Sequence, residues 1–245
     1  MKRILFATIA LAILSTAAAA QTSVTDGLAG LGEASASGRI VQMIAAVTVL
    51  SVAPGLLIMV TSFTRFVIAL SFLRSGLGLQ TTPANLIMIS LALFMTFYVM
   101  APTLDKSWQE GVKPLIEAKI TEEQAYDRIV TPFKAFMRSN VREKDVRLFE
   151  DLAREKLHLK ADAGDIEMRV LIPAFMISEL RRAFEIGFLI VLPFLVIDMV
   201  VATLTMSMGM MMLPPTTVSL PFKVLFFVLI DGWNQIVGSL VRSFI

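Results

Sequence analysis

Methionine is concentrated in one short stretch, MSMGMMMLPP at residues 206–215, and thioether sulfur has two uses in proteins. It is a soft ligand that suits Cu(I), and on a flexible unbranched side chain it also forms an adaptable apolar surface. The candidate side chains are Met208, Met210, Met211 and Met212. The stretch contains no Cys or His, and the one His of the chain, His158, lies far away. A methionine-lined metal transporter therefore stays an alternative, but we expect no metal site and no other cofactor.

Two carboxylates in apolar surroundings raise a second possibility, an intramembrane aspartyl protease. Asp198 lies in LVIDMV and Asp231 in LIDGW, each within an apolar run. Such an enzyme needs two carboxylates that share a proton. Neither Asp has the glycine-flanked Gly-x-Gly-Asp context typical of that chemistry. The chain also has no phosphate-binding loop, dinucleotide glycine pattern, His-Glu-x-x-His or nucleophile elbow. We therefore predict that the protein is not an enzyme, with the protease as the lesser alternative.

Charged side chains in or near apolar segments point to ion pairing instead of catalysis. A charge at the centre of a bilayer costs about 3 kcal/mol on insertion scales, so such groups should face protein or water and pair. We expect these residues to form ion pairs, within or between subunits, that set the register of the helices. The candidates are Arg65, Glu179, Asp198, Lys223 and Asp231.

Apolar runs on both sides of the methionine stretch predict a helical hairpin over 184–245. The runs cover 184–205 and 218–241, and each is long enough to cross a bilayer as a helix. Glycine and proline stop a helix from continuing through the turn. The residues that we expect to shape this loop are Gly209, Pro214 and Pro215.

A second apolar hairpin is predicted over 40–104, from runs at 40–63 and 84–104. Pro54 and Gly55 should bend the first of these runs. Together the two hairpins give an all-α membrane protein with about four long apolar helices, which we expect to build a ring or helical oligomer.

The segment 105–183 between the hairpins is predicted to be soluble and helical. Its first part, 105–169, holds 14 of the 20 acidic and 13 of the 22 basic residues. Thr121 and Gln124 form a capping-box pattern, and the apolar stripe over 143–157 recurs at helical spacing.

Prolines and one charge pair refine this picture of the middle segment. Thr131-Pro132 and Pro173 each suit the start of a helix, because proline is tolerated in the first turn. Arg181 and Glu185 are spaced as an i,i+4 ion pair on a helix surface.

The N-terminal residues predict export. Residues 1–20 have a basic start, a short apolar core and a small-residue end, which is typical of a signal peptide cleaved between Ala20 and Gln21. Residues 21–39 are rich in small and hydroxyl residues and predict a flexible exported leader. With the N-terminus outside, the order of the apolar runs places the charged segment in the periplasm.

Composition agrees with a membrane protein. The chain is 56% hydrophobic and 17% charged, and its mean hydropathy is +0.75. Its formal net charge of +2 is too small to suggest binding to nucleic acid. It has no cysteine, so disulfides play no part.

Two segments resemble the signature segments of the FliP family of flagellar export-gate proteins, which has injectisome relatives. They are PAFMISELRRAFEIG at 173–187 and PFLVIDMVVATLTMSMGMMMLPP at 193–215. Stretches at 50–83, 91–102 and 219–233 are also similar to that family, so the resemblance covers nearly all of 40–245. A cleavable signal peptide is usual in the flagellar branch, which favours it over an injectisome-type paralogue.

The resemblance implies a pore-forming, non-enzymatic subunit of the flagellar type III export gate, in the inner membrane at the basal body. It implies a homo-pentamer that assembles with FliQ and FliR, docks FlhB and FlhA, and uses FliO as an assembly factor. Unfolded export substrates would pass through it, and membrane lipid would surround only part of it. In that family the methionine-rich loop lines the closed pore as a gasket, which here matches 208–212, with the core at Met210, Met211 and Met212.

Overall fold

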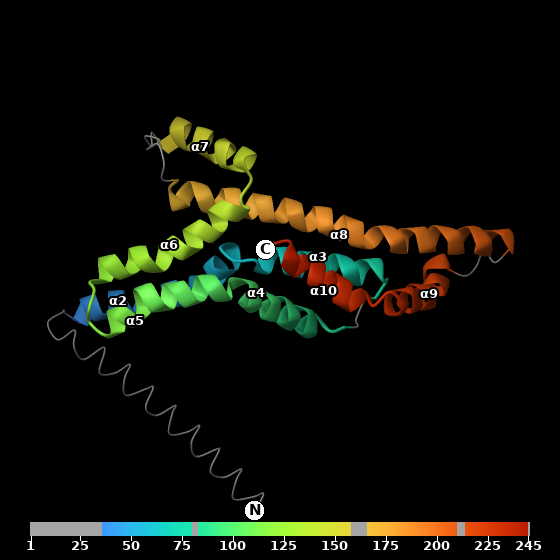
Figure 1. The fold of residues 1–245 in the computed structure, drawn as a ribbon, viewed down its shortest axis with the longest axis horizontal. Coiled ribbons are helices and arrows are strands. Elements are labelled where there is room, and N and C mark those ends of the chain that lie inside the picture. Colours follow the sequence, from blue (N-terminus) through green and yellow to red (C-terminus); the bar gives the residue numbers. More distant parts are fainter. Residues whose placement is uncertain (1–35, 80–82, 158–165, 210–213, 245) are drawn as a thin grey trace, which may run out of the picture. The chain divides into compact units, whose positions relative to one another are not determined.

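The computed structural model describes residues 36–79, 83–157, 166–209 and 214–244, and within them it is all helical, as predicted (Figure 1). The elements are α2 (Ala36–Met59), α3 (Phe63–Gly76), α4 (Asn85–Ser107), the π-helical turn η1 (Trp108–Val112), α5 (Lys113–Ile116), α6 (Glu122–Asn140), α7 (Glu143–Leu157), α8 (Met168–Ser207), α9 (Pro215–Leu229) and α10 (Gly232–Arg242). The signal peptide and its cleavage site at Ala20 and Gln21 lie outside these residues.

The chain divides into two compact units, residues 1–54 and 55–245. The described part of the first unit is the N-terminal portion of α2. Because α2 begins at Ala36, the last residues of the segment predicted as a leader are helical. All contacts discussed below belong to the second unit.

Helix α8 is the longest element and determines where most of the others lie. It has 40 residues, which at the rise of an α-helix is about 60 Å, roughly twice the hydrocarbon core of a bilayer. The prediction of a helix start at Pro173 was wrong: α8 begins at Met168 and continues through Pro173 and Pro193. The predicted boundary between the soluble segment, which ends at residue 183, and the C-terminal hairpin, which begins at residue 184, therefore lies inside one continuous helix.

Helices α4, η1 and α5 form a second long rod, Asn85–Ile116, which passes through the boundary drawn at 104/105. Its π-helical turn contains Gly111, and a side chain there would collide with Ile129 of α6. The hydroxyl of Ser107 donates to the Ile129 carbonyl at 3.0 Å. Pro114 has no amide hydrogen to donate to the carbonyl of Glu110, which lies in the π-helical turn. The missing hydrogen bond favours the local change from α-helical to π-helical register. The turn thus lets α6 approach the rod closely.

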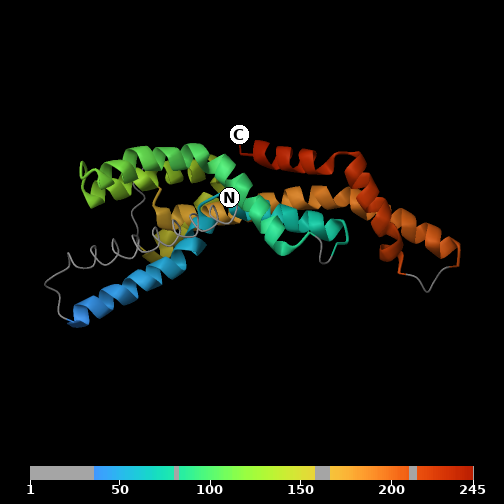
Figure 2. The ribbon, with the colours of Figure 1, turned by 90° about the horizontal axis from the view of Figure 1, so that it is seen from below.

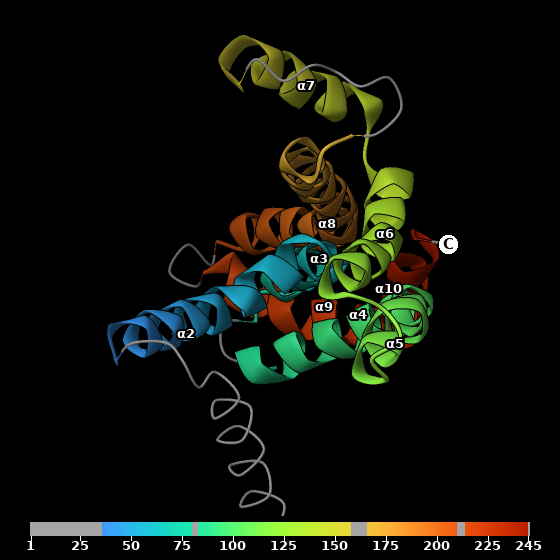
Figure 3. The ribbon, with the colours of Figure 1, turned by 90° about the vertical axis from the view of Figure 1, so that its left-hand side faces the viewer.

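Helices α6 and α7 form the charged middle segment. The predicted capping box is confirmed: the Thr121 hydroxyl accepts from the Gln124 amide and the Gln124 side chain accepts from the Thr121 amide. The predicted helix start at Thr131-Pro132 was wrong, because both residues lie inside α6. There the Thr131 hydroxyl donates to the Asp127 carbonyl at 2.7 Å instead of capping a new helix. The helix predicted at 143–157 is confirmed as α7, which packs on α8 (Figure 3).

The last apolar run forms two helices, α9 and α10, although the sequence predicted one. Their axes differ by 65° (Figure 2). Asp231 stands at the break with a left-handed backbone, φ +52°. The next residue, Gly232, is buried against the ring of Phe227, where a Cβ would clash. The bend therefore rests on a close contact at Gly232 that hydropathy alone does not reveal.

Within the described residues, two helical rods are long and apolar enough to cross a membrane, Asn85–Ile116 and Met168–Ser207. The bent pair α9–α10 would make a third if it acts as one span. That is fewer than the four or so long apolar helices expected from hydropathy. The other expected helices are shorter: α9 and α10 have 15 and 11 residues, and within α2, which holds most of the first apolar run, Met43–Val52 counts as a shorter apolar helix.

Two apolar clusters hold the second unit together. The larger joins α3, α4, α8, α9 and α10, and its most buried members are Phe66, Ala69, Leu70, Leu73, Ala92 and Leu240. The smaller joins α6 to the start of α8 through Met137, Leu171 and Phe175. Charged residues that belong to this interior need partners, and they form the candidate site.

Candidate functional site

Arg65 of α3 and Glu179 of α8 form a fully buried ion pair, with both side chains 0% exposed. The contact is bidentate: Nε of Arg65 donates to Oε2 of Glu179 at 2.7 Å, and Nη2 donates to Oε1. A planar guanidinium matches the two carboxylate oxygens, which is the strongest geometry for such a pair. Because desolvating two charges is costly, this pair is tolerated only with its hydrogen bonds complete.

The end of the chain completes the coordination of Arg65. Its Nη1 donates to the carbonyl and to the hydroxyl of Ser243, at 3.0 and 2.9 Å. Its guanidinium carbon lies 3.5 Å from the centre of the Phe244 ring, a cation–π contact. Arg65 therefore ties α3 to both α8 and the C-terminal end.

Phe244 extends this cluster to the charged middle segment. Its ring meets Phe66 edge-on at 5.4 Å between centroids and stacks on Phe136 of α6 at 5.9 Å. We call Arg65, Glu179, Ser243 and Phe244 the arginine cluster. It lies where α3, α6, α8 and the chain end meet, so it couples the soluble and apolar helices.

Ser178, next to Glu179, was not among the residues singled out from the sequence. It is buried, its hydroxyl lies 2.6 Å from Oδ2 of Asp145, and the Arg142 amide donates to it at 3.1 Å. It thus attaches the start of α7 to α8 beside the arginine cluster. The sequence hinted at a role for Ser178 only because it is a polar residue within an apolar helix face. Helical spacing does not predict its contact with Asp145, which is 33 residues away.

Asp198 of α8 and Lys223 of α9 form a second ion pair, 2.6 Å between Nζ and Oδ2. Lys223 also donates to the Gly76 carbonyl of α3 at 3.0 Å. The other oxygen of Asp198 accepts from the Ser219 hydroxyl at 2.5 Å. The lysine side chain is 5% exposed and the aspartate 27%, so this pair is open to solvent on one side. We call Asp198, Ser219 and Lys223 the lysine cluster.

Asp231 joins neither cluster. It is exposed at the break between α9 and α10, where its backbone amide donates to Val228 and its carbonyl accepts from Gln235. Asp198 already gives its two oxygens to Ser219 and Lys223. Asp198 and Asp231 therefore form no carboxylate pair that could share a proton, and among the described residues no group of three or more His, Cys, Asp or Glu side chains could hold a metal ion.

The methionine loop is described only at its two ends. Helix α8 ends at Ser207, Met208 is 71% exposed, and Gly209 has a left-handed backbone with φ +74°. On the far side, Pro214 is extended and Pro215 begins α9. Met210, Met211 and Met212 lie outside the described residues. Gly209 and the two prolines thus occupy the ends of the α8–α9 loop.

Known proteins provide independent information on this chain. A model of the FliP family matches residues 46–240. The flagellar biosynthetic protein FliP of Agrobacterium fabrum is 63% identical over 212 residues, which cover 86% of each chain. The protein of that name from Rhizobium meliloti is 60% identical over 97% of each chain. The one from Bacillus subtilis is 52% identical over 83% of this chain and 91% of its own length. The residues matched by the family model contain the methionine loop, the lysine cluster, and Arg65 and Glu179 of the arginine cluster.

Proposed function

Since the chain belongs to the FliP family, a family of flagellar export components without enzymatic activity, we propose that it is the pore-forming core subunit of the flagellar type III export gate. The observation that carries this proposal is the identity of about 60% to flagellar proteins over nearly the whole chain. In this role it supports export of flagellar proteins and assembly of the flagellum.

The exposed faces of α8 and α9 support assembly with other subunits. Large apolar side chains remain exposed along both helices, including Phe184, Phe188, Leu189, Met199, Phe222, Leu225 and Leu229. Contiguous apolar surface of this kind has to be covered by lipid or by protein. A homo-pentamer with FliQ and FliR would cover part of it. FlhB and FlhA would dock to that assembly, and FliO would assist it.

A ring of such hairpins would present its α8–α9 loops to a common axis. Met208, Met210, Met211 and Met212 would then form an apolar constriction. Such a constriction resists ions by dewetting, and flexible thioethers can part for an unfolded polypeptide. Gly209, Pro214 and Pro215 set the ends of the loop.

For the location, we propose the inner membrane at the basal body, with α6 and α7 on the periplasmic side before assembly. The signal peptide predicted at 1–20 and the concentration of charge in 105–169 support this orientation. A reporter enzyme that works only in the periplasm should therefore be active when it is fused within α7, and one that works only in the cytoplasm should be inactive there. Activity of a cytoplasmic reporter at the same position would overturn the orientation.

The role in export is tested by deleting the gene in the chain's own host and measuring secretion of hook protein and flagellin. We expect both to be lost and to return when the parent chain is supplied from a plasmid. Secretion by any injectisome of the same host serves as the control and should not change. Normal flagellar secretion in the deletion strain would refute the proposal and favour an injectisome-type role.

A further inference from the structure

The last apolar run exposes two different surfaces, one on each side of the 65° bend between α9 and α10. From Pro221 to Ile230 every exposed residue is apolar, and Leu229 is 75% exposed. After the bend, the exposed residues of the run are polar or charged except for Trp233, and they are Asp231, Asn234, Gln235, Ser239 and Arg242. The pair α9–α10 qualifies as one membrane span by length and composition, which do not separate these two surfaces.

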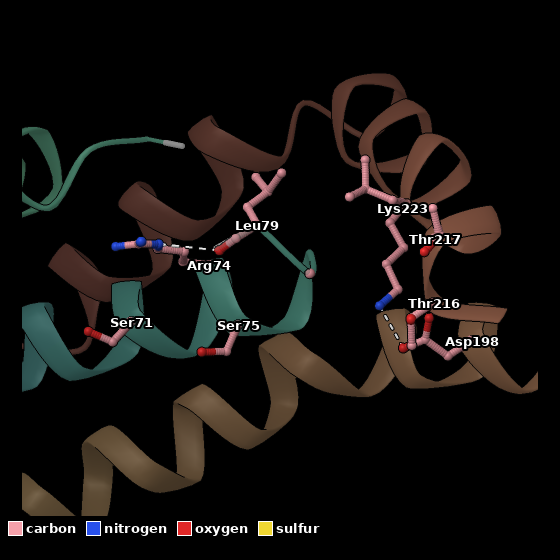
Figure 4. Close-up of a pocket in the computed structure, with 10 residues that line it drawn as sticks. Ser71, Arg74, Ser75, Leu79, Asp198, Thr216, Thr217 and Lys223 are labelled. Atoms are coloured by element: carbon pink, nitrogen blue, oxygen red, sulfur yellow. Dashed lines mark hydrogen bonds and ion pairs between the residues drawn. The ribbon is translucent and has the colours of Figure 1, made fainter. Parts of the chain in front are cut away.

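The polar side chains in the middle of α9 point toward the protein. Figure 4 shows Lys223 reaching Asp198 of α8, and the Ser219 hydroxyl donates to the same carboxylate. A polar pocket of about 960 Å³ opens beside this pair, between α3, α8 and α9. The outward face of α9 over 221–230 therefore keeps only apolar groups, which suits contact with acyl chains.

Helix α10 has the opposite arrangement. Leu240 is fully buried, and Ile236, Val237 and Val241 pack against the larger apolar cluster, so the protein interior uses the apolar side of this helix. Its polar residues recur every three or four positions along the outward side. Among the described residues, neither Asp231 nor Arg242 has an ion-pair partner. Hydrocarbon would penalise both charges, so this face requires water.

Close contacts hold the two surfaces in a fixed relation. A Cβ at Gly232 would meet the ring of Phe227, so the chain packs tightly where it turns. The side-chain amide of Gln235 donates to the Ile230 carbonyl at 2.5 Å, which satisfies an acceptor that the break leaves free. The change from an apolar to a polar outward face is therefore built into the fold.

Trp233 lies at this change of surface. Its ring meets Phe227 edge-on at 5.4 Å between centroids, and the side chain is 41% exposed. Among the described residues its indole N–H has no acceptor. Tryptophan is enriched where membrane meets water, because its ring is apolar and its N–H needs a polar partner.

The far end of α10 lies beside the charged middle segment. Phe244, two residues after α10, stacks on Phe136 of α6 at 5.9 Å between centroids. Because α6 belongs to the part of the chain predicted to be soluble, this contact brings the end of the chain to the level of the aqueous segment.

We propose that, in the membrane before assembly, the bilayer surface meets this run at Trp233. The outward face of α9 contacts acyl chains, Trp233 lies at the level of the headgroups, and the polar face of α10 lies in water on the same side as α6. The partner of this surface is thus the lipid surface, and α9–α10 does not cross the bilayer as one span. The proposal rests on the proposed membrane location, and not on the role in export.

The depth of Trp233 is tested by quenching of its fluorescence in the full-length chain, reconstituted into phosphatidylcholine vesicles. The chain has two tryptophans, and Trp108→Phe leaves Trp233 as the only one. We expect strong quenching by lipids with bromine near the headgroup end of the acyl chain, and weak quenching by lipids with bromine near its other end. In the matched chain, Trp108→Phe and Trp233→Phe are combined with Leu225→Trp. This places the tryptophan on α9, where the deep bromine should quench more strongly.

The absence of cysteine provides a second measurement. In cells that make the chain without its partners, a maleimide that does not cross membranes labels thiols in water. Asn234→Cys and Ser239→Cys on α10 should be labelled. Leu225→Cys and Leu229→Cys, also exposed in the single chain, should stay unlabelled because lipid covers them.

Ser139→Cys on α6 marks the aqueous side and should be labelled from the same side as α10. Labelling of this thiol and of both α10 thiols only in inverted vesicles would support the proposal while overturning the proposed orientation, so the two failures are distinguishable. Equal labelling of the α9 and α10 thiols would overturn the proposal. It would also be overturned if the deep bromine quenches Trp233 best, or if neither lipid quenches it.

Discussion

The two ion pairs of this protein use the same chemistry in different surroundings. Arg65 and Glu179 are both 0% exposed, whereas Lys223 and Asp198 are 5% and 27% exposed beside a polar pocket. In the arginine cluster a rigid fork makes a bidentate contact to Glu179, and Ser243 accepts two further hydrogen bonds from Nη1. In the lysine cluster a flexible ammonium makes one contact to the carboxylate and one to the Gly76 carbonyl.

This difference separates two structural tasks. The arginine cluster joins four parts of the chain in a dry interior, so loss of one partner would leave an unpaired charge that water cannot reach. The lysine cluster can be rehydrated through the pocket when its contacts are lost. We therefore expect the arginine cluster to fix the fold and the lysine cluster to adjust the packing of α9 on α3 and α8.

The largest expected effect comes from breaking the arginine cluster. Arg65→Ala or Glu179→Ala should destabilise the chain by about 3–5 kcal/mol, because each leaves a buried charge without its partner. Thermal unfolding of the purified complex, and its yield from membranes, measure the loss. Arg65→Met combined with Glu179→Met removes both charges and should recover much of the stability. A normal yield from both single variants would contradict this role.

Breaking the lysine cluster should cost less. Lys223→Met leaves Asp198 with its Ser219 contact and with access to solvent, so we expect a loss of about 1–3 kcal/mol. The same unfolding measurement, made beside Arg65→Ala, gives the comparison directly. Equal losses of stability in the two variants would show that the difference in solvent exposure between the two ion pairs does not change their contribution to stability.

Asp198→Asn keeps the shape of the lysine cluster and tests the alternative of a protease. We expect the complex to assemble and to retain most of its export activity, since the amide oxygen can still accept a hydrogen bond. Complete loss of function with assembly intact would instead indicate a chemical role for this carboxylate.

A smaller loss is expected at the end of the chain. Phe244→Leu keeps apolar volume but removes the cation–π contact with Arg65 and the ring contacts with Phe66 and Phe136. We expect a loss of roughly 1–2 kcal/mol, seen as a lower unfolding temperature. Phe94→Leu is the matched control, because that ring is exposed on α4. An unchanged unfolding temperature for Phe244→Leu would exclude the chain end from the arginine cluster.

The smallest effect should come from the exposed pair on α8. Arg181 and Glu185 form the i,i+4 pair predicted from their spacing, 2.8 Å apart and more than half exposed. Arg181→Gln should change stability by about 0.3–0.5 kcal/mol, near the detection limit of unfolding experiments. A loss comparable to that of Lys223→Met would mean that this surface is covered in the complex.

Local signals in the sequence predicted part of this structure correctly. The capping box at Thr121 and the amphipathic helix at 143–157 depend on neighbours within a few residues, and both are present. The predictions of helix starts at Pro132 and Pro173 were wrong because both prolines lie within longer helices that pack on other elements. Tertiary packing there outweighs the local preference of proline.

Partners distant in the sequence were beyond such reasoning. The cost of burying charge implied that Arg65, Glu179 and Lys223 need partners, but it did not identify them. Arg65 and Glu179 are 114 residues apart, and the Ser243 contact to Arg65 spans 178 residues. The crossing of α3 and α8 brings Arg65 and Glu179 together, and the position of the residues after α10 brings Ser243 to them. Ser178 was missed for the same reason.

The proposed pore is tested most directly through Met210, Met211 and Met212. Cells carrying a chain with all three replaced by Ser are compared with parent cells for permeability to small ions and dyes, and recovery of the complex is measured in parallel. We expect the variant complex to assemble normally but to leak, because polar side chains at the constriction admit water. An assembled variant that seals as tightly as the parent would contradict the gasket role and leave the methionines as an ordinary apolar turn.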